Sequence, residues 1–126
     1  MKGFLMRRII IGMTGASGAI YGIRALQLLR DVPEIETHAV FSPAALRTAL
    51  HETGMPPREI EALADHTHSH RDIGASIASG SFRTAGMLVA PCSVKTLSAI
   101  AHCYDADLIT RAADVCLKER RRVVLL

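Results

Sequence analysis

The feature that most constrains the fold is a buried-strand pattern that runs directly into a glycine-rich turn. Residues 7–14 contain three consecutive isoleucines, and a continuous β-branched run is typical of a strand covered on both faces. The segment GMTGASG, residues 12–18, follows at once, and residues 19–30 then carry apolar side chains at helical spacing. A strand, a tight turn and a helix in this order predict the start of a parallel sheet with crossover helices.

The rest of the chain repeats this alternation. Strands are predicted at 36–41, 84–90 and 123–126, helices at 42–52, 58–64, 93–102 and 106–120, and a loop with one short strand at 65–82. The pattern predicts an α/β fold in which helices cover both faces of a parallel sheet. The length of 126 residues predicts one domain, residues 1–126. Ligands of such sheets bind at the carboxyl ends of the strands, near a topological switch point.

Composition excludes several classes of protein. Hydrophobic residues make up 49% and charged residues 21%, which argues against disorder, and no apolar run approaches the roughly 20 residues of a membrane span. The net charge is only +3, and aromatic residues are 4%, so the basic face with stacking aromatics of a nucleic-acid domain is not predicted.

Cysteine usage and the N-terminus bear on location. Cys92, Cys103 and Cys116 are odd in number and lack CxxC spacing, so neither a zinc site nor a disulfide framework is predicted. Their expected role is that of buried small apolar residues. The basic residues 1–8 lack the long apolar stretch of a signal peptide, and a reducing cytoplasm is the expected location.

The first strand-to-helix turn, residues 12–18, is one of two with chemical potential. Its glycines permit close backbone approach, and N–H groups at a helix start attract phosphate or another anion. The spacing is not the G-x-G-x-x-G of dinucleotide sites, so NAD binding is a weak alternative. A tight turn that needs glycine only for packing is the other interpretation.

The second such turn is Pro91 to Thr96, which follows the strand predicted at 84–90. Ser93, Lys95 and Thr96 combine hydroxyls, a cation and free N–H groups at a helix start, as a phosphate site requires. The alternative is that Ser93 caps the helix and Lys95 is merely exposed.

A third set of polar residues lies on the last predicted helix. Arg111, Asp114 and Lys118 fall at i, i+3 and i+7 and so share one face. Two cations on that face favour an anionic ligand, and a solvated face with ion pairs is the alternative. His66, His68 and His70 alternate and are expected to line one face of a short strand. No metal site is predicted from them, because a further ligand and a rigid frame are needed.

Three separated motifs identify a family resemblance. These are residues 14–19, TGASGA, with Tyr21-Gly22; residues 91–98, PCSVKTLS; and residues 111–121, RAADVCLKERR. In this order they resemble the UbiX-type flavin prenyltransferases, formerly described as aromatic-acid decarboxylase subunits. The resemblance covers nearly the whole chain from Arg8 onward.

The resemblance implies a flavodoxin- or Rossmann-like subunit that binds FMN. Members of this family attach a dimethylallyl group from dimethylallyl phosphate to N5 and C6 of the flavin, without a metal. The product, prenylated FMN, serves a partner UbiD-type decarboxylase in ubiquinone synthesis or aromatic-acid breakdown. The family usually assembles as a homododecamer, with active sites shared between subunits.

The resemblance also assigns residues. The FMN contacts that it implies are Gly15, Ala16, Ser17, Ser42, Ser93, Val94, Lys95 and Thr96. The catalytic residues that it implies are Ser17, Glu52, Arg111 and Lys118. Ser17 is expected near flavin N5, and Glu52 or the departing phosphate is expected to accept a proton. Arg111 and Lys118 are expected to stabilise the charge that develops on the leaving phosphate.

The chain also departs from the family. Family members continue beyond the position of Leu126, and they carry an Arg-Glu pair and later a tyrosine and a basic residue at the substrate phosphate. Arg122 stands where the family usually has proline. A truncated copy or a fragment is therefore expected, with a sheet that is incomplete at its C-terminal end and exposes an apolar face. An FMN-binding module without catalytic activity is the alternative. Related flavoproteins that decarboxylate a cysteine-containing intermediate are a further alternative, against which the RAAD…KERR run argues.

Overall fold

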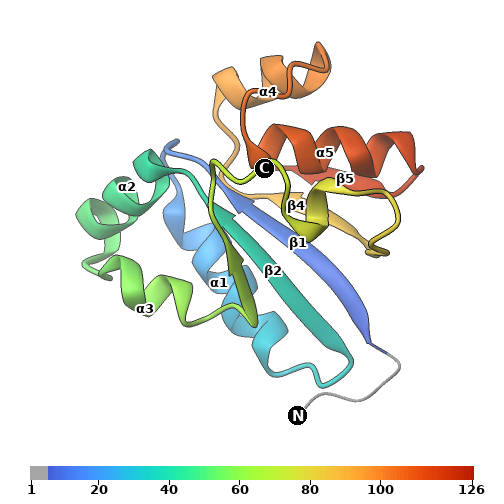
Figure 1. Cartoon of the computed structure of the whole chain (residues 1–126). Coiled ribbons are helices and arrows are strands. Elements are labelled where there is room, and N and C mark those ends of the chain that lie inside the picture. The colour runs from blue at the N-terminus through green and yellow to red at the C-terminus, as the bar shows by residue number, and fades with distance from the viewer. Residues whose placement is uncertain (1–5) are drawn as a thin grey trace.

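The computed structural model describes residues 6–126 and shows a parallel sheet between two layers of helices (Figure 1). The strands, in chain order, are β1 (Arg7–Met13), β2 (Ile35–Phe41), β3 (His66–His68), β4 (Gly86–Val89) and β5 (Arg122–Leu125). The helices are α1 (Ala19–Arg30), α2 (Pro43–Thr53), α3 (Pro57–Glu61), α4 (Val94–Ala101) and α5 (Leu108–Lys118), with a 3₁₀ turn at Ser76–Ala78. The predicted α/β class is confirmed.

The sheet has five strands in the order β3-β2-β1-β4-β5, and all the pairings are parallel. The chain passes from β1 to β2 on one side and later returns to β4 on the other side. The carboxyl ends of β1 and β4 therefore form a topological switch point, where ligands of such sheets bind.

Alternation along the strands separates two cores. Ile11 and Phe41 face one side, where they pack with Ile23 and Leu26 of α1. That side is covered by α1, α2 and α3, whereas α4 and α5 lie on the opposite side, as Figure 1 shows. Because successive strand residues point to opposite faces, the continuous isoleucine run of β1 supplies both cores. Helices on both faces are thus confirmed.

Side chains satisfy first-turn N–H groups of α2, α4 and α5. The α5 helix begins at Leu108 rather than at the predicted residue 106, because Asp107 accepts the N–H of Thr110 at 2.9 Å. The Thr110 hydroxyl oxygen in turn accepts the N–H of Asp107 at 3.2 Å, which completes a capping box. The helix ends two residues earlier than predicted, and Arg120 beyond it has a φ of 57°.

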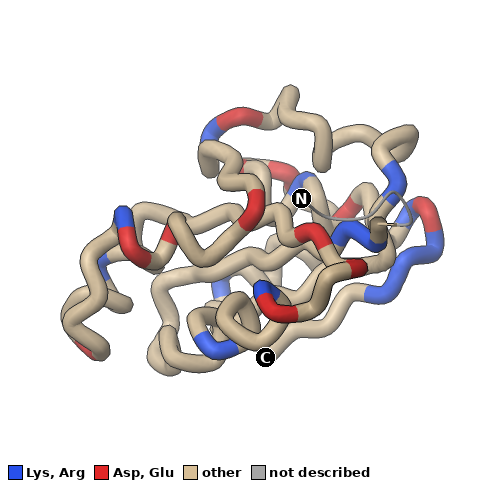
Figure 2. Tube along the Cα trace, turned by 90° about the horizontal axis from the view of Figure 1, so that it is seen from below, with Lys and Arg blue, Asp and Glu red and all other residues tan. Residues whose placement is uncertain are grey.

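Surface features are in part as predicted. Figure 2 shows basic and acidic positions interspersed along the trace. Val124 and Leu126 are 47% and 61% exposed, so apolar side chains near β5 do face outward.

The longest described helix, α1, has 12 residues, and no helix within residues 6–126 has the length and apolarity of a bilayer span. The expectation that residues 1–8 are not a signal peptide concerns residues that lie mostly outside the described range.

Candidate functional site

A cavity of about 450 Å³ lies at the carboxyl ends of the central strands. The turns that follow β1, β2 and β4 form its walls, together with the loop after β3 and the start of α5. Its lining residues are Thr14, Gly15, Ser42, Pro43, Ala44, Arg47, His70, Ser93, Lys95, Thr96, Asp107 and Ile109. Five of the eight residues predicted to contact FMN line this cavity, namely Gly15, Ser42, Ser93, Lys95 and Thr96. The structure thus brings the two strand-to-helix turns together.

The two turns are joined by Thr14, a residue that sequence reasoning did not select. Its buried hydroxyl donates to the carbonyl of Pro91 at 2.7 Å and accepts the N–H of Ser93 at 2.9 Å. The Thr14 N–H also donates to the carbonyl of Pro91, at 3.2 Å. These bonds fix the position of the α4 start relative to the glycine-rich turn. The Thr-Gly sequence after β1 was the available signal.

At the second turn, Ser93 caps α4. Its hydroxyl oxygen accepts a hydrogen bond from the N–H of Thr96 at 3.2 Å, and its O–H donates to the Thr96 hydroxyl oxygen at 3.0 Å. The two interpretations of this turn are compatible, because a capping serine leaves the N–H groups of Val94 and Lys95 without partners inside the helix. Val94 is 80% exposed.

At the first turn, the chain itself supplies an anion. One oxygen of Glu52, Oε1, accepts the N–H of Gly18 at 3.2 Å and the N–H of Ala19 at 3.0 Å. Glu52 lies in α2, so it caps a helix that begins 33 residues earlier. The start of α1 was predicted to attract phosphate or another anion, and the anion found there is this carboxylate. Within residues 6–126, the second oxygen of Glu52 forms no hydrogen bond.

The glycine-rich turn also packs tightly against α2. A Cβ atom on Gly15 would lie 2.5 Å from the Cβ of Ala44, which is far inside van der Waals contact. Ser42 begins α2 by accepting the N–H of Ala45 at 3.0 Å, and it lines the cavity beside Gly15. Glycine is therefore required at position 15 because Ala44 of α2 comes so close. Ala16 and Ser17 continue the turn between Gly15 and the capped start of α1.

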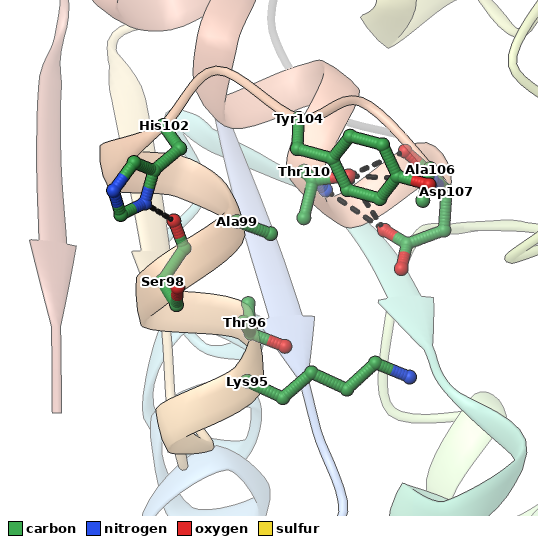
Figure 3. A pocket seen from close by; sticks show the side chains of 9 residues that line it. All are labelled: Lys95, Thr96, Ser98, Ala99, His102, Tyr104, Ala106, Asp107 and Thr110. Carbon is green, nitrogen blue, oxygen red and sulfur yellow. Dashed lines mark hydrogen bonds between the residues drawn. The ribbon is translucent and has the colours of Figure 1, made fainter.

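A second cavity, of about 540 Å³, adjoins the first (Figure 3). The two share Lys95, Thr96 and Asp107, and the second extends between α4 and the start of α5. Figure 3 shows the Lys95 side chain extended away from α4. The other residues that line the second cavity include Tyr104 and His102. The sequence did not indicate either residue, because no spacing links them to the motifs.

Two predicted catalytic residues lie elsewhere on α5. Each forms an ion pair: Arg111 Nη1 lies 3.6 Å from Asp105 Oδ2, and Lys118 Nζ lies 3.8 Å from Glu119 Oε2. Neither lines the two cavities described above. Asp107 marks the cavity end of α5, and the eleven residues from there to Lys118 span about 16 Å at the α-helical rise. Lys118 thus lies toward the opposite edge of the sheet, with its side chain 64% exposed.

Asp105 beside Arg111 is electrostatically unusual. Its Oδ1 atom is buried and has no hydrogen-bond donor within the described chain. Burial raises the pKa of Asp105, and the neighbouring Asp114 carboxyl raises it further, while Arg111 acts in the opposite direction. Two carboxyl groups in contact favour a shared proton.

The three alternating histidines separate. His66 and His68 belong to β3 and lie beside His38 of β2, as the predicted one-faced strand requires. His70 lies past the strand and lines the first cavity, with its Nε2 atom 3.3 Å from Asp107 Oδ2. Burial lowers the pKa of both His38 and His68. A hydrogen bond from His38 lowers the pKa of Glu36.

The cysteines are unpaired, and only one is buried. Cys116 is buried, Cys92 is half-buried and Cys103 is exposed, so the expected burial holds fully for Cys116 alone. Burial raises the pKa of the Cys92 and Cys116 thiols, which keeps both protonated and unreactive at neutral pH.

Comparison with known proteins decides the family. The model of the family described as Flavoprotein matches residues 5–126. The chain belongs to the flavoprotein family. Flavin prenyltransferase UbiX of Escherichia coli K12 is 62% identical over 120 residues, which cover 95% of this chain and 64% of the relative. UbiX of Thauera aromatica is 55% identical over 94% of this chain and 61% of the relative. The chain thus spans somewhat less than two thirds of these relatives.

Solved flavoprotein structures agree. AnUbiX (PadA1), in complex with FMN and dimethylallyl pyrophosphate, superposes with a TM-score of 0.93 at 52% identity, over 95% of this chain and 63% of that chain. A dodecameric FMN-dependent UbiX-like decarboxylase from E. coli O157:H7 gives 0.93 at 51% identity, over 94% and 64%. The cysteine decarboxylase TvaF matches with a TM-score of 0.67 at 14% identity, which shows a common fold alone.

Proposed function

We propose that this chain is a flavin prenyltransferase subunit that joins a dimethylallyl group from dimethylallyl phosphate to FMN. The observation that carries the proposal is the convergence, on one cavity, of four of the five polar side chains that the family resemblance assigned to FMN. These are Ser42, Ser93, Lys95 and Thr96. The 62% identity to E. coli UbiX supports the same activity.

The cavity fits a flavin phosphate. A phosphate needs a cation, hydroxyl donors and free N–H groups, and Lys95, Thr96 and the start of α4 offer these together. Because the Ser93 hydroxyl donates to Thr96, the hydrogen of the Thr96 hydroxyl is available to a ligand. The cavity volume of about 450 Å³ lies within the usual range of ligand sites. Gly15, Ala16 and Val94 complete the proposed contacts through their backbone.

The proposed chemistry assigns a task to each catalytic residue. When bound, FMN supplies N5 and C6 as the atoms that receive the dimethylallyl group, and prenylated FMN is the product. Ser17, in the exposed part of the first turn, is proposed to lie near N5. Glu52 is held at the start of α1 by two N–H groups, and its second oxygen is proposed to accept a proton.

We propose that a second copy of the chain supplies Arg111 and Lys118. Both cations would stabilise the phosphate that leaves the dimethylallyl group. Lys118 lies about 16 Å along α5 from the cavity of its own chain, so it suits the cavity of a neighbour. Exposed apolar residues near the cavity, Val94, Leu97 and Tyr104, offer a surface for association. A homododecamer is the proposed assembly, as in the dodecameric E. coli O157:H7 relative.

The wider setting is part of the proposal. Residues 1–126 are proposed to act as one FMN-binding domain, which the continuous sheet from β3 to β5 supports. The three unpaired cysteines suit the cytoplasm. The product is proposed to serve a UbiD-type decarboxylase.

An FMN titration followed by addition of dimethylallyl phosphate tests the activity. We expect saturable quenching of flavin fluorescence by the chain. Once the bound FMN is reduced with dithionite in the absence of oxygen, so that N5 is a nucleophile, dimethylallyl phosphate should change the flavin absorbance and add the mass of the dimethylallyl group to the extracted flavin. Isopentenyl phosphate, in which the double bond is not allylic, is the matched control.

The same experiment distinguishes the alternative function. The location of Lys118 away from the cavity of its own chain favours, for an isolated subunit, an FMN-binding module without catalysis. Saturable binding without a mass gain would establish that module and refute the prenyltransferase proposal. Absence of binding would refute both.

A further inference from the structure

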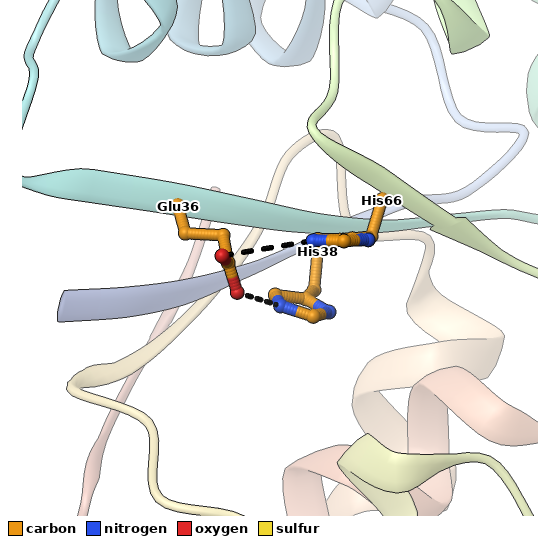
Figure 4. A group of neighbouring side chains, drawn as sticks. All are labelled: Glu36, His38 and His66. Atoms are coloured by element: carbon orange, nitrogen blue, oxygen red, sulfur yellow. Dashed lines mark hydrogen bonds and ion pairs between the residues drawn. The ribbon is translucent and has the colours of Figure 1, made fainter. Parts of the chain in front are cut away.

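Three side chains that commonly bind metals converge away from the FMN cavity, at the beginning of β2 and β3 (Figure 4). They are Glu36, His38 and His66, and one ligand atom from each lies within 4.8 Å of the others. The parallel register pairs His38 directly with His66. Glu36 and His38 share a face because they are two residues apart on one strand. The backbone of two hydrogen-bonded strands therefore fixes the arrangement.

The distances suit a small divalent ion. His38 Nε2 is 2.8 Å from Glu36 Oε1, and His66 Nε2 is 3.6 Å from Glu36 Oε2. Zinc binds nitrogen and oxygen ligands at about 2.0–2.1 Å, so the edges of a tetrahedral site are about 3.3 Å long. The separation between His66 Nε2 and Oε2 is within about half an ångström of that length, and His38 Nε2 lies next to the other oxygen of the same carboxylate.

Residues around the cluster provide the support that metal-bound histidines usually have. His68 Nε2 lies 2.9 Å from His38 Nδ1, so the second nitrogen of His38 has a partner that orients the ring. The Phe82 ring packs edge-on against His38, which is only 4% exposed. Arg8 holds Glu36 Oε1 at 3.4 Å and leaves Oε2 directed toward His66.

We propose that Glu36, His38 and His66 bind one divalent transition-metal ion of the zinc class, with water as the remaining ligand. Two imidazoles and one carboxylate match the ligand preference of such ions. His38 can ligate through Nε2 when its hydrogen is on Nδ1 and donates to His68 Nε2. Metal binding therefore needs a change of tautomer in His38 and His68, and the two histidines together lose no proton. The sequence did not predict this site, because His66 meets the other two ligands only through the β2–β3 register.

The bound ion would link an edge strand to the sheet. The β3 strand has three residues and pairs only with β2 among the described strands. A metal bridge from His66 to Glu36 and His38 would therefore stabilise β3 where few backbone hydrogen bonds do. The site lies apart from the FMN cavity, so this inference stands independently of the prenyltransferase proposal.

Titration of the full chain with Zn²⁺ against a chromophoric zinc chelator tests the site. We expect one ion per chain, together with a rise in the melting temperature. His66→Val removes a ligand whose side chain is 53% exposed, so this variant should fold. Its zinc affinity should fall at least tenfold and its thermal shift should be lost. His51→Ala, which removes an exposed histidine on α2, is the matched control and should bind as the unchanged chain does.

A second variant examines the supporting histidine. His68→Ala keeps all three ligands, and loss of such a supporting hydrogen bond commonly weakens metal binding by roughly 10- to 100-fold. Co²⁺ should give the visible absorption of a tetrahedral site in the unchanged chain and not in His66→Val. Zinc binding that survives His66→Val, or no binding by the unchanged chain, would overturn the proposal.

Discussion

Thr14 and Ser93 are 79 residues apart, and the N–H of Ser93 donates to the Thr14 hydroxyl at 2.9 Å. The same hydroxyl donates to the carbonyl of Pro91 at 2.7 Å. The glycine-rich turn after β1 and the capped start of α4 are thus held together by one buried side chain. The geometry of the proposed FMN site depends on this connection, since each turn supplies one side of the cavity.

The first prediction concerns that connection. Thr14→Val preserves the shape of the side chain but leaves the N–H of Ser93 without its acceptor and removes one of the two donors to the Pro91 carbonyl. Loss of such a partner commonly costs about 1–3 kcal/mol in the free energy of unfolding. FMN affinity should fall as well, because the two turns lose their fixed separation. Urea unfolding and FMN titration measure the two effects. Thr14→Ser retains the hydroxyl and should stay close to the unchanged chain, and equal behaviour of Val and Ser would contradict this role.

The second prediction separates two roles of Glu52. Glu52→Gln keeps an oxygen that accepts the N–H groups of Gly18 and Ala19 but removes the basic carboxylate. Glu52→Ala removes both, and loss of a helix cap costs about 0.5–2 kcal/mol of stability. The Gln variant should therefore unfold near the unchanged chain yet form prenylated FMN slowly, whereas the Ala variant should lose stability as well. Full activity of the Gln variant would show that Glu52 is a cap alone.

The third prediction tests the sharing of a site between subunits. Lys95→Ala should weaken FMN binding, while Lys118→Ala should bind FMN normally and transfer the dimethylallyl group slowly. If each site combines Lys95 of one chain with Lys118 of another, random co-assembly of the two variants regenerates about a quarter of the sites in a closed homo-oligomer.

Product formation by the separate and co-assembled variants measures this complementation. Subunits carrying both substitutions, mixed with the Lys118→Ala variant, are the control and should show no recovery. No recovery in the first mixture would mean that both lysines act within one chain.

The fourth prediction is a pH dependence of stability that arises from Asp105. Burial and Asp114 raise its pKa in the folded chain above the ordinary aspartate value of 3.8. The folded state therefore retains a proton that the unfolded state has already released, so this contribution to stability is present below pH 3.8 and is lost as pH rises through the folded pKa. Asp105→Asn has no ionisable group at this position, so its stability does not decrease with rising pH for this reason.

Urea unfolding of both proteins across the acid range measures the effect. The stability of Asp105→Asn relative to the unchanged chain should increase as pH rises from below 3.8 to neutrality. The ion pair with Arg111 is lost at the same time, but Arg111 is 47% exposed and such pairs contribute little. A difference between the two proteins that is constant with pH would contradict the proposed proton.

Local patterns accounted for most of the elements. The isoleucine run of β1, the Ser-Pro start of α2 and the Ser93 cap of α4 all lie where the sequence predicted them. The end points of α5 and the 3₁₀ turn at Ser76–Ala78 needed the structure, because capping boxes and irregular loops depend on side-chain contacts.

The sequence alone determined a parallel sheet with helices on both faces, the two turns with chemical potential, and the family resemblance, because each depends on residues close together in the chain. Only the tertiary structure decided how distant residues meet. It joined Thr14 to Ser93, capped α1 with Glu52, and placed His66 beside Glu36 and His38. It also put Lys118 at the far end of α5 from the cavity. Strand register and helix direction set these meetings, and both are fixed by packing over the whole sheet rather than by any local run of residues.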